Sequence, residues 1–283
     1  MALRILTDSS ADMEPEEFMA RDVICVPLSV TFGDEIFHDG FEISKDEFYR
    51  LLVTRDVHPQ TSQPSPEEFL REFLKAKEAG DDIIAIVLAS GLSGTIQSAT
   101  IAKDMADYDR ITVVDSLTVA TGLRMLLDIA VGMRDDGASA EDIAAMVKQV
   151  QPRIRIYAVV DTLEYLYRGG RLNKATATVG GLVNVKPLIC VENEAGKVNL
   201  IGIGVGKERA AKKLVSIIEA DEKDPAFPIY FPYSHDRKNV DALIETLDPE
   251  HKYLDNKHCY NLGPTIGTHI GAAAFGITYV VKE

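Results

Sequence analysis

The stretch Ile83-Ile84-Ala85-Ile86-Val87-Leu88-Ala89-Ser90-Gly91-Leu92-Ser93-Gly94-Thr95 decides the fold class of this chain. It is an apolar, largely β-branched run that ends in a turn of glycines and small hydroxyl residues, and a helix is expected to follow from about Ile96. Runs of this kind between helical segments are typical of parallel strands buried on both faces. Ligands of such sheets collect beyond the carboxyl ends of the strands, so this turn is the first candidate site.

Two further strand-like runs end in the same way. They are Leu3–Thr7, before Asp8-Ser9-Ser10, and Ile111–Val114, before Asp115-Ser116. Strands and helices alternate up to about residue 150, and the pattern changes at Gln151-Pro152 to hairpins mixed with helices. We therefore expect a two-domain α/β protein, with an N-terminal parallel-sheet domain over residues 1–151 and a C-terminal α+β domain over residues 152–283.

The other elements follow from local signals. Ser44-Lys45-Asp46-Glu47 and Ser65-Pro66-Glu67-Glu68 both fit the capping box that starts a helix. Val23–Val30 is expected to form one strand, in which Pro27 indicates an edge or a bulge. The remaining predicted helices cover residues 98–105, 120–134, 140–150, 208–220 and 239–247, and the remaining strands cover 154–160, 185–191, 197–205, 229–233 and 277–281, with a hairpin turn at 192–196.

Composition narrows the class of protein. The 283 residues are 46% hydrophobic and carry a formal charge of -14, which argues against binding to nucleic acid because phosphates would be repelled. The three cysteines are too far apart for a zinc site or a disulfide framework, and we expect free thiols. The start of the chain lacks a signal-peptide pattern, and the most apolar stretch, residues 111–133, contains charged residues. We expect a soluble, cytoplasmic protein without a transmembrane segment.

Three stretches could bind a small anion. Ser93 lies between glycines at an expected helix start, where free N–H groups attract anions, although a hydroxyl there can also simply cap the helix. Thr61-Ser62 precedes the helix that starts at Ser65, and alone it reads as an extension of that cap. His269 lies in the glycine-rich stretch Gly263–Gly271, and a lone histidine is usually a satisfied core residue.

A fourth stretch, Tyr167–Lys174, concentrates positive charge in an acidic protein. Its arginines, Arg168 and Arg171, are either solvated or held by glycines as contacts for an anion or a partner. Other tempting motifs fail. Gly202–Lys207 resembles a phosphate loop, but Glu208 stands where Ser or Thr must hold magnesium, and the histidines at 235 and 258 lack further metal ligands. We expect neither a metal site nor a cofactor.

Taken together and in order, these motifs resemble the DegV family, whose better understood members are bacterial fatty-acid-binding proteins of the FakB type. The similarity covers nearly the whole chain. Its motifs are Thr7–Asp12, Val26-Pro27-Leu28 with Phe32-Gly33, Asp46–Tyr49, Thr61–Pro66, Ser90–Thr95, Val114-Asp115-Ser116, Asp161-Thr162-Leu163, Gly169-Gly170-Arg171, Lys186-Pro187 and Gly263–His269.

The resemblance implies a protein that buries one long acyl chain and holds its carboxylate at the domain junction. The implied carboxylate-binding residues are Thr61, Ser62, Ser93 and His269, and the implied supporting residues are Gly94, Thr95, Gly267 and Thr268. His269 would donate a hydrogen bond, either neutral or as imidazolium. Arg171, and with it Arg168, would contact a separate ATP-dependent fatty acid kinase that phosphorylates the carboxylate, so the chain itself would be no enzyme.

The sequence departs from the family pattern in two places, Ala272-Ala273 near the expected headgroup and Gly204–Lys207 in a turn that usually bears arginine. Two alternatives to the fatty acid carrier stay open. One is a serine-dependent acyl hydrolase or transferase with Ser93 as nucleophile and His269 as base, although the turn is not Gly-x-Ser-x-Gly and no acid partner is evident. The other is a carrier for a different apolar acid.

Overall fold

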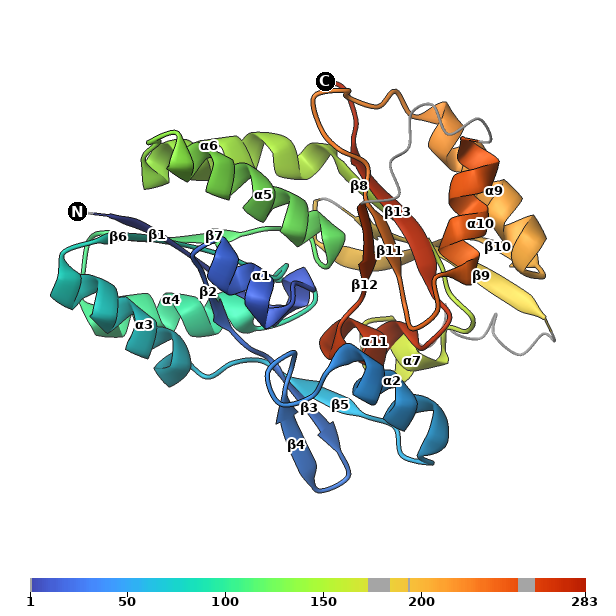
Figure 1. The fold of residues 1–283 in the computed structure, drawn as a ribbon, viewed down its shortest axis with the longest axis horizontal. Helices are drawn as coiled ribbons and strands as arrows, with labels where there is room; N and C mark the ends of the chain where they lie inside the picture. The colour runs from blue at the N-terminus through green and yellow to red at the C-terminus, as the bar shows by residue number, and fades with distance from the viewer. Residues whose placement is uncertain (1, 173–183, 193, 249–257) are drawn as a thin grey trace.

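The computed structural model describes residues 2–172, 184–192, 194–248 and 258–283, which form two lobes facing each other (Figure 1). Asn193 of the expected hairpin turn and the last residues of the basic stretch, Asn173 and Lys174, lie outside these ranges. The described residues contain three β-sheets, of four, six and three strands. The predicted α/β class is confirmed.

The first sheet is parallel throughout, as predicted. Its strand order is β2 (Val23–Val26), β1 (Leu3–Asp8), β6 (Asp82–Val87) and β7 (Ile111–Asp115). Successive residues of β6 enter different cores: Ile84 and Ile86 pack with α5 (Thr121–Asp135) and α6 (Ala140–Val150). Ile83 and Ala85 pack with α3 (Pro66–Ala79) and α4 (Thr95–Ala106) on the other face. Both faces are therefore buried, which is why the sequence of β6 is continuously apolar.

Two helices begin where their capping sequences predict. Ser65 and Glu68 form the full capping box at the start of α3. At α2 (Lys45–Thr54), Ser44 accepts from the Glu47 N–H, but the Glu47 carboxylate pairs with Arg50 and does not return the bond to the backbone. The box predicted there is therefore half formed. Helix α4 begins at Thr95, one residue before the start expected near Ile96 and three residues before the predicted range 98–105.

The second sheet is mixed and forms the core of the other lobe. Its order is β10 (Lys197–Val205), β9 (Val185–Glu192), β8 (Ile154–Val159), β13 (Phe275–Val280), β11 (Phe231–Tyr233) and β12 (Cys259–Asn261). Strands β9 and β10 form the predicted hairpin, with Glu192 opposite Lys197. Helices α9 (Lys207–Ala220) and α10 (Lys238–Leu247) pack on this sheet. The predicted domain boundary falls in η2 (Gln151–Arg153), and the division itself stays a prediction.

The third sheet is one that the sequence reading missed. It consists of β4 (Glu35–His38), β3 (Ser29–Phe32) and β5 (Gln60–Ser62), at the bottom of Figure 1. The single strand predicted over Val23–Val30 is therefore wrong. Because Pro27 has no N–H to donate, pairing stops there: β2 ends at Val26 on the edge of the parallel sheet, and β3 begins at Ser29 in the new sheet. This break matters because the small sheet carries Thr61.

Helix α11 (Pro264–Ile270) belongs to the C-terminal half but packs on the N-terminal half. The Tyr49 hydroxyl of α2 donates to the Leu262 carbonyl at 3.0 Å. Gly267 has no room for a side chain, because a Cβ there would lie 2.5 Å from the Phe48 ring. The short helices η1 (Ser9–Ala11), α1 (Pro15–Ala20) and α7 (Glu164–Arg168) complete the described elements. Helix α11 therefore lies at the junction of the two lobes.

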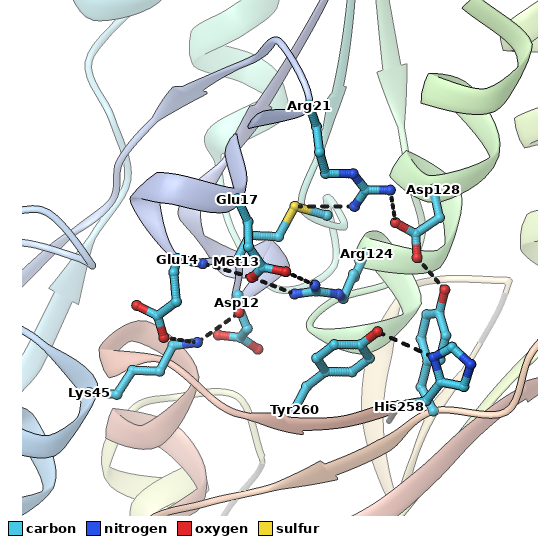
Figure 2. Close-up of polar contacts among 11 residues, drawn as sticks. Asp12, Met13, Glu14, Glu17, Arg21, Lys45, Arg124, Asp128, His258 and Tyr260 are labelled. Carbon is cyan, nitrogen blue, oxygen red and sulfur yellow. Dashed lines mark hydrogen bonds and ion pairs between the residues drawn. The ribbon is translucent and has the colours of Figure 1, made fainter. Parts of the chain in front are cut away.

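A polar network joins the lobes between α1 and α5 on one side and β11 and β12 on the other (Figure 2). The buried Arg124 guanidinium lies 3.8 Å from the centre of the Tyr260 ring and pairs with Glu17. The Asp128 carboxylate accepts from the Tyr230 hydroxyl and pairs with Arg21. A desolvated cation on an aromatic face is stabilising, so this network helps to fix how the lobes meet.

Candidate functional site

A largely apolar cavity lies where the two lobes and the small sheet meet. It encloses about 540 Å³ of space, its opening included. Its apolar lining comes from both lobes: Leu28, Leu88, Leu92, Val119, Leu166, Val198, Ile266 and Ile270. Its polar lining is Thr61, Gln63, Ser93, Thr265, Arg171 and His269.

Three of the four predicted carboxylate-binding residues line this cavity together. The Thr61 hydroxyl of β5 is 2.9 Å from His269 Nε2 of α11, and Ser93 stands at the start of α4 with its hydroxyl 2.9 Å from that of Thr95. Ser62 differs: it is exposed and does not line the cavity, because successive side chains of a strand point to opposite faces. The binding role of all four residues stays a prediction.

The surroundings of His269 favour the neutral form of its ring. Its Nδ1 is buried and has no hydrogen-bond partner in the described part of the chain. Burial, and after it the positive charges of Arg171 and His58, lower the pKa of His269 to about 3. Both effects disfavour the imidazolium form, one of the two forms that the sequence left open.

The same contacts bear on the hydrolase alternative. Among the described residues, the Ser93 hydroxyl is bonded to Thr95 and the His269 ring to Thr61, and no bond joins Ser93 to His269. The pKa of His269 is set by burial and by positive neighbours, with no carboxylate among its causes. A serine nucleophile needs a base in reach and a third group that orients that base. The described geometry supplies neither.

The predicted supporting residues have structural explanations. A Cβ at Gly94 would lie 2.2 Å from the Gln63 amide oxygen, so a larger residue in the turn at Ser93 would displace the Gln63 side chain. Gln63 is fixed in turn, because its amide donates to the Ser98 hydroxyl at 2.9 Å. The buried Thr268 hydroxyl donates to the Pro264 carbonyl and so stabilises α11 itself.

The two predicted docking arginines lie in different environments. Arg168 is exposed on α7 and pairs with Glu164. Arg171 is half-buried and lines the cavity, where Nε donates to the Leu92 carbonyl at 2.9 Å and Nη1 to the Gly169 carbonyl at 2.6 Å. The sequence reading therefore missed that Arg171 brings positive charge to the cavity. It also missed Gln63, although Gln63 directly follows the Thr61-Ser62 pair.

Two kinds of feature are absent from residues 2–172, 184–192, 194–248 and 258–283. No group of three or more histidine, cysteine, aspartate or glutamate side chains is arranged to hold a metal ion. No helix combines the length and apolar character that crossing a bilayer requires.

Gly169 offers a test of how tightly His269 is held. A Cβ at Gly169 would lie 2.1 Å from His269 Nδ1, and its φ of -75° is ordinary, so the conflict is steric alone. We expect Gly169→Ala to displace the ring and to cost about 1–3 kcal/mol of unfolding free energy, measured by chemical denaturation. Gly132→Ala in α5 is the matched control, because a Cβ there meets nothing within 4 Å and should stabilise the helix by up to about 1 kcal/mol. Equal changes in both variants would contradict this packing.

The fold and the cavity define an α/β binding protein with a mainly apolar pocket that has a polar end. The chain belongs to the DegV family: the model for "Uncharacterised protein, DegV family" matches residues 2–282. A DegV domain-containing protein of Caldanaerobacter subterraneus is 35% identical over 280 residues, which cover 99% of each chain.

Solved structures agree with this membership. A DegV family protein from Thermus thermophilus, reported as binding fatty acid, has a TM-score of 0.87 at 30% identity, with 100% of both chains covered. A stearic acid-binding protein from Eubacterium ventriosum has a TM-score of 0.83 at 28% identity, covering 100% of this chain and 99% of its own. The family and the fold class predicted from the sequence are thus confirmed.

Proposed function

We propose that this protein binds a long-chain fatty acid, with the acyl chain in the apolar cavity and the carboxylate at Thr61, Ser93 and His269. The observation that carries the proposal is the cavity itself: apolar walls from both lobes, and hydroxyl and imidazole groups gathered in one place. The fatty acids reported for the Thermus thermophilus and Eubacterium ventriosum proteins support it.

The energetics favour such a ligand. Burying each methylene contributes about 0.8 kcal/mol, so a chain of ~16 carbons supplies on the order of 10 kcal/mol before losses. Ordering the ligand and the side chains around it costs several kcal/mol of this, which leaves submicromolar binding within reach. The polar groups then need only to fix the carboxylate. Arg171 adds a positive charge that favours an acid over a neutral lipid.

The proposal includes a partner. The bound carboxylate is presented to a separate ATP-dependent fatty acid kinase, which transfers the γ-phosphoryl group of ATP to it and forms an acyl phosphate. This protein then acts as a carrier in the cytoplasm and not as the enzyme. The family resemblance supports this role, and so does the exposed Arg168 on α7, one residue before the glycine that packs on His269. Ser62, exposed beside Thr61, is a second group that could face the arriving kinase.

The first test is to extract the purified protein with organic solvent and to identify any co-purified ligand by mass spectrometry. We expect a stoichiometric fatty acid, whose identity gives the preferred chain length and unsaturation. The loaded protein with ATP alone should form no acyl phosphate, and adding a fatty acid kinase should start its formation. A different apolar acid in the extract would redirect the proposal. An empty extract, with no binding of added fatty acids, would overturn it.

A further inference from the structure

The first turn of α11 is capped by side chains from the other lobe. Helix α11 begins at Pro264, and its N-cap residue, Gly263, has no side chain that could satisfy the free N–H groups of a helix start. The Gly263 N–H donates to Asp12 Oδ1 at 2.7 Å, and the Thr265 N–H donates to Asp39 Oδ2 at 3.3 Å. Two carboxyl groups that are distant in sequence therefore accept the hydrogen bonds that a local N-cap side chain would otherwise accept.

Asp39 is itself held on several sides. It is 2% exposed, and the oxygen that accepts from α11 also accepts from the Ser9 hydroxyl at 3.0 Å. Its own N–H donates to the carbonyl of Leu28, a residue that lines the cavity. The backbone of Asp39, whose carboxyl group caps α11, is thus bonded to a residue of the pocket wall.

Asp12 is fixed by its backbone as well as by its side chain. It is 2% exposed and adopts the left-handed conformation, with φ 57°. Its carbonyl accepts from Lys45 Nζ at 2.8 Å, and Lys45 also pairs with Glu14 (Figure 2). This conformation is sparsely populated for residues other than glycine. Contacts from both lobes hold Asp12 in it, so the surroundings of Asp12 fix its position. Neither Asp12 nor Asp39 touches the cavity, and the proposed function gives them no role.

Helix α11 connects these capping contacts to His269 in the candidate ligand site. His269 lies five residues after Pro264 on α11. Gly267, between them, packs so closely against α2 that a Cβ would not fit there. Because the helix is rigid over this length, a shift of its first turn moves the His269 ring away from Thr61, to which it is bonded at 2.9 Å.

We propose that Asp12 and Asp39 are positioning residues of the headgroup site: by capping α11 from the other lobe, they set the place of His269 opposite Thr61. The proposal rests on the proposed function, in which His269 binds the carboxylate. It assigns a role to Asp12, the last residue of the Thr7–Asp12 motif, and to Asp39, which follows β4; contact with the ligand gives neither of them a role.

The test compares alanine with asparagine, which keeps an acceptor oxygen. Asp12→Ala is expected to weaken hexadecanoic acid binding by about tenfold in calorimetric titration, whereas Asp12→Asn should stay within about threefold. In a His269→Ala background, Asp12→Ala should cost less than about twofold, because the group it positions is gone. Asp34→Ala, exposed in the β3–β4 turn, is the control.

A second readout needs no ligand. Amide hydrogen exchange of residues 262–270 should speed up in the Asp12→Ala variant and stay as in the unmodified protein in Asp12→Asn. If Asp12→Ala does not fold, the Asp39→Ala and Asp39→Asn pair serves in its place. Unchanged affinity and protection in the alanine variant would overturn the proposal, as would an equal loss of affinity with and without His269. If the unmodified protein binds no fatty acid, the proposed function fails, and the exchange result still decides whether the capping is real.

Discussion

Replacing His269 by alanine is expected to weaken the binding of hexadecanoic acid by about 10- to 100-fold. The change removes one hydrogen bond to a charged group, which contributes about 1.5–3 kcal/mol when buried. It also leaves the Thr61 hydroxyl without its partner at 2.9 Å. Ser93→Ala should act in the same direction. Isothermal titration with the delipidated protein measures both.

The control for this variant is His38→Ala, which removes a half-exposed histidine that pairs with Glu42 on the small sheet, away from the cavity. Its affinity should match that of the unmodified protein. An affinity within about twofold for His269→Ala as well would show that the headgroup is held elsewhere in the cavity, and Arg171 would then become the first alternative.

The second large effect expected is a loss of stability as pH rises. Burial raises the pKa of Asp12 to about 8 and that of Asp39 to about 6, both from 3.8. Since both values exceed those of the unfolded chain, the folded protein holds protons that the unfolded chain has already released. Their stabilising contribution is complete below pH 3.8 and disappears as pH rises through 6 for Asp39 and 8 for Asp12.

Between pH 6 and pH 8 the Asp12 carboxyl should account for about 2 kcal/mol of lost unfolding free energy. Urea denaturation at several pH values should show this slope in the unmodified protein and a flatter one in Asp12→Asn. Asp34→Asn, a surface change, should keep the original slope. Parallel curves for the unmodified protein and Asp12→Asn would mean that Asp12 is already ionised at pH 6.

Other charged and titratable groups surround Asp12 and Asp39. They are Asp8, Glu14, Glu17, Cys25, Lys45, Tyr49 and Arg124.

Much of the fold could be read from local sequence because its signals are local. The continuous apolar run of β6 requires burial on both faces, and Ser65 with Glu68 requires a helix start. The small sheet was missed because its strands have only three or four residues and are partly exposed. One signal could have found it: Gly33-Asp34 is a two-residue turn between Phe32 and Glu35, which pair across β3 and β4.

The candidate site was harder to predict from pattern, since its members come from four distant segments. The family resemblance brought Thr61, Ser93 and His269 together, while each residue alone reads as a cap or a core histidine. The apolar lining residues, such as Val119 and Val198, have no sequence signature. In the sequence they cannot be distinguished from the many other apolar residues that are buried in the two lobes. The capping of α11 by Asp12 and Asp39 likewise exists only in the tertiary structure.

The distances in sequence across the site set the order in which it can assemble. Thr61 and His269 are 208 residues apart, Asp39 and Thr265 are 226 apart, and Asp12 and Gly263 are 251 apart. Closing loops of this length is entropically costly and slows folding, so these contacts are expected to form late. During synthesis, all four strands of the parallel sheet, the last of which ends at Asp115, leave the ribosome long before residues 263–269 are made. The Thr61–His269 pair cannot form until residues 263–269 have been made and α11 has packed on α2, β3 and β5, so the polar lining of the cavity is completed only when nearly the whole chain has been synthesised.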